Sequence, residues 1–214
     1  MENKLKEFND ALCDVRKAHR LIYSYQQRML DLAYFIKTKL DFPDFQAKKG
    51  FSEDISKNRR SKYLRIWNDM WAWDFIYSYM FEYYLGEIEL DNGDSCALSI
   101  IQYSDTGYFD ADGESRTDIN SFAEEEESAS KLLFILEVKP RKKKWIWDID
   151  EISLDKEYGS SKHVKDLLIS DKGNMQVLYS FTLNRFLNEK TSLNALHEFV
   201  DYCKNNDVVE LSII

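Results

Sequence analysis

The chain has 214 residues with 29 Lys and Arg against 38 Asp and Glu, which gives a net charge of −9, and 44% of its residues are hydrophobic. A chain of this length and composition buries a core of its own and is not intrinsically disordered. It holds no run of roughly 18 to 20 charge-free apolar residues and no secretory signal, so we expect a cytoplasmic protein without a membrane partner.

The rare residues and the missing motifs exclude several classes of site. The three cysteines and the three histidines are scattered, without a CxxC pair or metal-ligand spacing, so neither a disulfide framework nor a zinc site is expected. No GxGxxG, GxxxxGK[ST], HExxH or GxSxG string occurs. Nucleotide-dependent enzymes and the common hydrolases are therefore disfavoured, and no cofactor is expected.

Residues 1–40 predict a long amphipathic helix. Apolar residues recur every three, four or seven positions, at Leu5, Phe8, Leu12, Val15, Ile22, Met29 and Ile36, which places them on one helical stripe. In heptad register, His19 and Gln26 occupy a positions, so packing against the same chain is favoured over a dimeric coiled coil. Self-association through this helix stays open as an alternative.

Residues 41–60 predict a connector, because Pro43 and the Lys48-Lys49-Gly50 string break the helical pattern. From Ser61 to Leu85 the chain is rich in Trp, Tyr and Phe, which predicts a core helix at the start of an α+β domain spanning residues 61–214. An aromatic-lined ligand groove is the alternative interpretation of this segment.

A hairpin is predicted next. Asn92-Gly93 separates the apolar runs Glu87–Leu90 and Cys96–Ile101, and Asn-Gly supplies the positive φ angles of a tight antiparallel turn. Residues 104–130 then become acidic and poor in apolar side chains, which predicts a mobile loop.

Two further strands are expected at Lys131–Lys139 and Trp145–Ile149, joined through a basic tip that consists of Arg141, Lys142, Lys143 and Lys144. The C-terminal portion predicts a short helix at Ser161–Ile169, a turn at Asp171–Asn174, a helix at Ser192–Lys204 and a final strand at Val208–Ile213. The predicted fold class is α+β: a long N-terminal helix and an aromatic-rich helix packed on a mainly antiparallel sheet, with a C-terminal helical portion.

One short segment carries candidate chemistry. In Glu137-Val138-Lys139, strand alternation places both charged side chains on one face, about 7 Å apart. The segment resembles the Glu-x-Lys half of the PD-(D/E)XK nuclease signature. That resemblance implies Mg²⁺-dependent phosphodiester cleavage, with Glu137 and Lys139 catalytic and with Asp105 and Glu137 as metal ligands. Glu82 or Glu87 could supply the helix-side acid.

The same segment is also typical of a solvated charge pair at a strand end. We therefore expect a protein-protein interaction module whose partner is another protein, of basic character because the chain is acidic. Inhibitors, immunity proteins and defence-system accessory proteins are of this kind. The alternative is the nuclease, in which Arg141, Lys142, Lys143 and Lys144 would contact nucleic acid; outside that alternative no nucleic-acid partner is expected.

Overall fold

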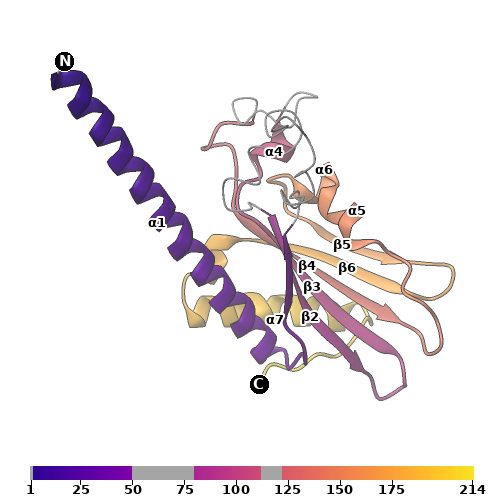
Figure 1. Ribbon diagram of the computed structural model, residues 1–214. Helices are drawn as coiled ribbons and strands as arrows, with labels where there is room; N and C mark the ends of the chain where they lie inside the picture. The colour runs from indigo at the N-terminus through magenta and orange to yellow at the C-terminus, as the bar shows by residue number, and fades with distance from the viewer. Residues whose placement is uncertain (1, 50–79, 112–121) are drawn as a thin grey trace, which may run out of the picture. The chain divides into compact units, whose positions relative to one another are not determined.

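The computed structural model describes residues 2–49, 80–111 and 122–214, and it shows an α+β fold, as predicted (Figure 1). The chain divides into two compact units, Met1–Ile36 and Lys37–Ile214. Helix α1 (Glu2–Lys39) provides the first unit and confirms the predicted N-terminal helix. Among the described residues, no helix combines the length and the apolar character needed to cross a bilayer.

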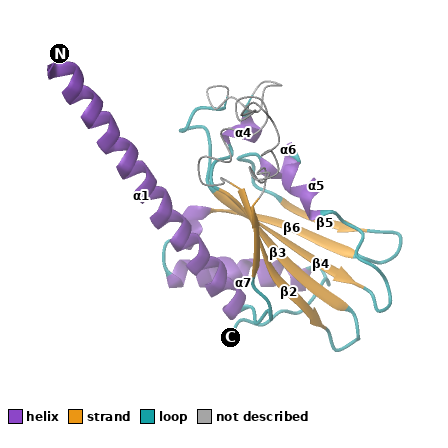
Figure 2. Ribbon diagram, viewed as in Figure 1, coloured by secondary structure: helices purple, strands orange, loops and turns teal. Residues whose placement is uncertain are grey.

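The second unit is built on a six-stranded sheet with the order β1-β2-β3-β4-β6-β5, in which neighbouring strands are antiparallel (Figure 2). Its strands are β1 (Gln46–Lys49), β2 (Met80–Glu89), β3 (Ser95–Tyr103), β4 (Lys131–Lys139), β5 (Lys165–Ile169) and β6 (Met175–Thr182). Its other elements are α4 (Gly107–Asp110), α5 (Ile149–Leu154), α6 (Lys156–Gly159), the 3₁₀ turn η3 (Leu183–Phe186) and α7 (Glu189–Asn205).

Helix α7 covers one face of the sheet, which we call the α7 face. Its Phe199 lies 5.0 Å, centroid to centroid, from Phe134 of β4 and 6.1 Å from Tyr179 of β6. Asn188 and Thr191 form a capping box at the start of α7, which satisfies backbone donors that a helix N-terminus leaves unpaired. The predicted helix at Ser192–Lys204 is thereby confirmed.

The described residues cover only part of the opposite face, which we call the front face. Ile101, Leu133 and Leu178 pack there in one buried cluster with Phe109 of α4, and Ile152 of α5 packs against that cluster. These short helices lie over the end of the sheet where β4 begins (Figure 1). The other end of the front face, towards the last residues of β4, holds the candidate site.

Lys131 closes the covered end of the front face. It is 2% exposed, and its ammonium donates to the carbonyl oxygens of Ser160 and Lys162 and lies 5.5 Å from the centre of the Tyr103 ring. Burial lowers the pKa of Lys131 to about 8. Its donors have carbonyl and ring partners, so this buried charge fastens the loop before β5 to the sheet.

The predicted hairpin is confirmed as β2–β3. Gly93 has φ +82° and donates its N–H to the Leu90 carbonyl at 2.7 Å. The predicted turn at Asp171–Asn174 joins β5 to β6, with Gly173 at φ +82°. Lys131–Lys139 is a strand with the predicted bounds.

The aromatic helix predicted for Ser61–Leu85 is wrong over residues 80–85, which begin β2; residues 61–79 lie outside the described part. Phe81 and Tyr83 alternate with Glu82 and Tyr84, the period of a strand. Pairing with β1 on one side and β3 on the other satisfies the backbone there, and this tertiary pairing overrides the local pattern.

The strand predicted at Trp145–Ile149 is also wrong. Strand β4 already pairs with β3 along one edge and with β6 along the other, so no edge is left for a hairpin partner. The chain instead runs irregularly to Asp148, whose side chain caps α5 by accepting from the Asp150 N–H.

Four smaller differences separate the structure from the prediction. Residues 165–169, predicted as helix, form the edge strand β5, and residues 208–213 form no strand. The predicted connector 41–60 contributes strand β1, while its residues 50–60 lie outside the described part. In the predicted acidic loop, α4 occupies residues 107–110, and residues 112–121 are not described.

Gly86 lies at a bulge in β2, where a side chain would be costly. Its φ is +109°, and a Cβ there would lie 2.9 Å from both Asp44 N and Pro43 Cγ. We expect Gly86→Ala to lower the free energy of unfolding by about 2 kcal/mol or more, from backbone strain plus overlap. Gly173→Ala is the matched control, because its φ is also positive but the nearest atom is 3.6 Å away, and it should cost about 1 kcal/mol. Urea denaturation measures both; equal losses would contradict the close approach at Gly86.

Candidate functional site

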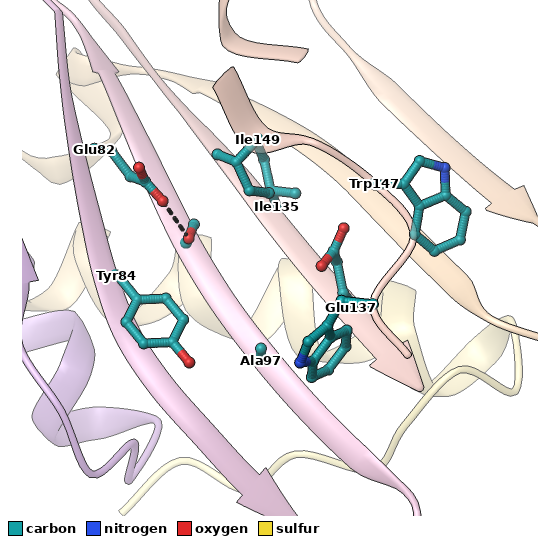
Figure 3. A pocket seen from close by; sticks show the side chains of 9 residues that line it. Glu82, Tyr84, Ala97, Ile135, Glu137, Trp147 and Ile149 are labelled. Carbon is teal, nitrogen blue, oxygen red and sulfur yellow. Dashed lines mark hydrogen bonds between the residues drawn. The ribbon is translucent and has the colours of Figure 1, made fainter. Parts of the chain in front are cut away.

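The front face carries an open pocket of about 260 Å³ that adjoins the start of α5 at Ile149 (Figure 3). Its floor consists of Ala97 and Ser99 from β3 and of Ile135 and Glu137 from β4. Its walls are Glu82 and Tyr84 from β2, and Trp145, Trp147 and Ile149 from the segment after β4. Two carboxylates therefore share one pocket with two indoles and a phenol.

Strand register brings the β2 residues to this face. Tyr84 pairs with Ser99, and beyond the bulge Glu87 pairs with Ala97. Without the extra residue, Tyr84 and Glu87 would face opposite sides, because their separation in sequence is odd. The bulge at Gly86 therefore lets both side chains stand on the front face.

The two tryptophans are held by the loop 140–148. Arg141 N donates to Asp94 Oδ1 at 2.9 Å, and Asn174 Nδ2 donates to the Lys144 carbonyl at 2.9 Å. Although the segment is not a strand, Trp145 and Trp147 both turn towards the sheet. The rings therefore wall a pocket and do not belong to the strand that was predicted at Trp145–Ile149.

Glu137 is the central polar group of the floor. It is only 6% exposed, and Gln176 Nε2 donates to its Oε1 at 2.5 Å. Burial raises the pKa of Glu137 to about 7, against the opposing effect of this hydrogen bond. Desolvation makes the ionised form costly, and at neutral pH both protonation states are populated.

Lys139 shares the face of Glu137, as predicted, because Glu137 pairs with Ala97 and Lys139 with Ser95. Its ammonium, however, donates to Ser95 Oγ at 3.2 Å, lies 3.8 Å from Glu87 Oε1 and stands 5.0 Å from the centre of the Trp145 ring. Among the described residues, the salt bridges do not include Glu137. The nearby lysine is thus bound at the pocket's edge.

The second carboxylate belongs to Glu82, which accepts from Ser99 Oγ at 2.9 Å (Figure 3). Beside it, the pKa of Tyr84 is raised by burial and then by Glu87, Asp44, Glu137 and Glu82. Since these four acids oppose ionisation of the phenol, the pocket carries a negative potential.

Asp105 does not join Glu137. It follows β3, and its Oδ1 accepts from Gly107 N at 2.8 Å. Tyr103 at the end of β3 pairs with Lys131, whereas Ala97 pairs with Glu137, so about 20 Å of strand separates the two ends. The structure therefore does not bring together the predicted metal pair; of the two stand-ins, Glu82 lines the pocket and Glu87 is engaged with Lys139.

Among the described residues, the pocket acids Glu82 and Glu137 are not part of a group of three or more candidate metal ligands. Within the described ranges, the one group of three or more acidic, His or Cys side chains with ligand atoms within 4.8 Å of one another is Glu124, Glu125 and Glu126, exposed on a turn. Arg141, Lys142, Lys143 and Lys144 are all exposed on the loop beside the pocket, and their contact with nucleic acid stays a prediction.

A second candidate surface lies on α1. Six apolar side chains there are 39 to 62% exposed: Leu5, Phe8, Leu12, Val15, Tyr23 and Leu30. Their spacing follows 3.6 residues per turn, with His19 and Gln26 at the intervening positions. We call this row the α1 stripe; it runs for about 38 Å.

Comparison with known proteins gave a match to a family model. A family model described as PM0109 matches residues 5–208. No curated protein and no solved structure matches the chain.

The raised pKa of Glu137 predicts how stability depends on pH. A carboxyl whose pKa rises from 4.5 to about 7 on folding destabilises the fold increasingly between those values and by a constant amount above pH 7. Glu137→Gln keeps the neutral shape, so its free energy of unfolding relative to the parent should rise from pH 4.5 to 7, by up to about 3 kcal/mol. Urea denaturation of both proteins between pH 4 and 8 measures this difference; a difference independent of pH would contradict the burial argument.

Proposed function

The chain belongs to the PM0109 family, and we propose that it is a protein-binding module that captures an amphipathic helix of another protein along α1. The observation that carries this proposal is the α1 stripe, with six large apolar side chains exposed in one row. An apolar row of this length in water is typical of a surface that a partner covers.

The spacing of the stripe favours a helix as the partner. Residues three and four positions apart form the ridges and holes into which side chains of a second helix pack. His19 and Gln26 interrupt the apolar row. Polar residues in a helical seam restrict the register and the choice of partner, which favours one specific partner over extended self-pairing.

Charge supports a partner of basic character. Residues 1–36 carry six Lys and Arg against five Asp and Glu, a net charge of +1, so residues 37–214 carry −9 − 1 = −10. A field of this sign accelerates encounter with a basic protein, whereas the apolar stripe supplies the affinity. Inhibitors, immunity proteins and defence accessories act through such encounters, and we place this protein among them as a hypothesis.

The nuclease alternative stays a prediction. It now rests on Glu82, Glu137 and Lys139, because Asp105 is at the other end of the strand pair. It requires Mg²⁺-dependent cleavage of DNA or RNA that Glu137→Ala abolishes in a protein that is still folded.

The proposal predicts loss of partner binding when the stripe is made polar. We expect the combined change Leu5→Gln, Phe8→Gln and Leu12→Gln to weaken binding at least about tenfold, because each removes an apolar anchor. Leu21→Gln is the control: Leu21 is 72% exposed but lies about 160° around the helix from Leu5. A photo-crosslinking residue at position 16, which is exposed beside the stripe, identifies the partner in every variant, and titration with that purified partner gives the affinities.

Light scattering of the purified chain provides the second readout. Two results together support the proposal. The purified chain is a monomer, and the partner crosslinks to the Leu21→Gln variant but not to the stripe variant. A dimer that dissociates in the stripe variant would show that the stripe pairs two copies of this chain and would contradict it. Circular dichroism verifies that α1 stays helical in each variant.

A further inference from the structure

The pocket on the front face has a charge that its own residues leave uncompensated. Glu137 is 94% removed from solvent, yet the described residues offer it an amide, Gln176, and no ammonium or guanidinium at ion-pair distance. A buried charge is stable when it is paired. Lys131, on the same strand and the same face, differs from Glu137 because its ammonium has two carbonyl acceptors and an aromatic ring as partners.

The walls are suited to an organic cation. Trp145, Trp147 and Tyr84 line the same space as Glu137, and the π-faces of Trp and Tyr attract ammonium groups. Trp145 already has a cation near it, because Lys139 Nζ lies 5.0 Å from its ring centre. The geometry thus shows one indole of the pocket in contact with an ammonium at the pocket's edge.

Other ligand classes fit less well. An anion would face Glu82, Glu137 and Glu87, and a neutral apolar group would leave the Glu137 carboxylate without a counter-charge. A pocket of about 260 Å³ is small for a nucleotide and adequate for an alkylammonium chain with its head group.

We propose that the pocket walled by Glu82, Tyr84, Trp145 and Trp147 binds an alkylammonium group, whose charge pairs with Glu137 on its floor. The ligand is a primary amine, either free or as the lysine side chain of a peptide. This site is separate from the α1 stripe, and the proposal does not depend on the function proposed for that stripe.

Proton linkage follows from the surroundings of Glu137. Facing it are Gln176 from β6, Lys139 from its own strand, Glu82, Tyr84 and Glu87 from β2, and the two indoles of the loop. An ammonium at the pocket stabilises the ionised carboxylate, so binding releases a proton wherever Glu137 is partly protonated. Affinity therefore rises with pH from about 6 to 8.

The test is a titration of the full chain followed by NMR of the indole N–H signals. The probe is n-butylammonium, with n-butanol and butyrate as neutral and anionic controls of similar size. We expect saturable shifts of the Trp145 and Trp147 signals with butylammonium and at least about tenfold weaker binding of both controls. Equal binding of butanol would overturn the proposal, because it would show an apolar site.

Matched variants locate the charge. Glu137→Gln should weaken butylammonium binding at least about tenfold and remove its pH dependence. The control, Glu89→Gln, removes the same charge from an exposed site on β2 and should change the affinity less than about twofold. Lys139→Met should strengthen binding, because it removes the competing ammonium. Equal losses in Glu137→Gln and Glu89→Gln would overturn the proposal, since they would indicate general attraction to an acidic surface.

Two further probes separate the sources of the amine. Tighter binding of spermidine than of acetyl-Gly-Lys-Gly-amide supports a free amine; the reverse order, lost when norleucine replaces the lysine, supports a lysine side chain. Displacement of butylammonium by Mg²⁺ at millimolar concentration, with the same indole shifts, would overturn the proposal in favour of a metal site.

Discussion

The cost of burying charge on β4 governs how the front face is built. Lys131 and Glu137 are both buried on this strand and point to the same side of the sheet. At Lys131 the chain supplies acceptors from the loop before β5, and α4, α5 and α6 pack over that end. At Glu137 it supplies an amide and an open, ring-lined pocket. The same strand therefore carries a closed structural charge at one end and an available charge at the other.

The elements that can be predicted from the sequence are those whose signals are local. The Asn92-Gly93 turn and the apolar run Lys131–Lys139 each determine their own conformation, because turn chemistry and strand alternation act within a few residues. Residues 80–85 and 165–169 were assigned wrongly as helix, since their strand conformation depends on partners elsewhere in the chain. For residues 80–85, the alternation of Glu82 and Tyr84 with Phe81 and Tyr83 was the signal that the aromatic composition concealed.

The candidate site shows the same division. Strand alternation correctly placed Glu137 and Lys139 on one face. The prediction that Asp105 lies beside Glu137 was wrong. The register between β3 and β4 depends on pairing along both whole strands, and the long connection between them does not fix that register in the sequence. The pocket walls were missed because Tyr84 reaches this face through the register of β2, and Trp147 through loop contacts to Asp94 and Asn174. A single acid within an apolar strand, followed closely by Trp-x-Trp, was the available signal.

The pKa of the Glu137 carboxyl, followed by carbon-detected NMR in the full chain with and without n-butylammonium, tests directly whether this buried charge awaits a cation. Because Glu137 is buried, we expect a titration midpoint near 7 in the free protein and a lower midpoint when the cation occupies the pocket. An ordinary value near 4.3 that does not respond to the amine would contradict this expectation, because the carboxylate would then be solvated and would need no counter-charge.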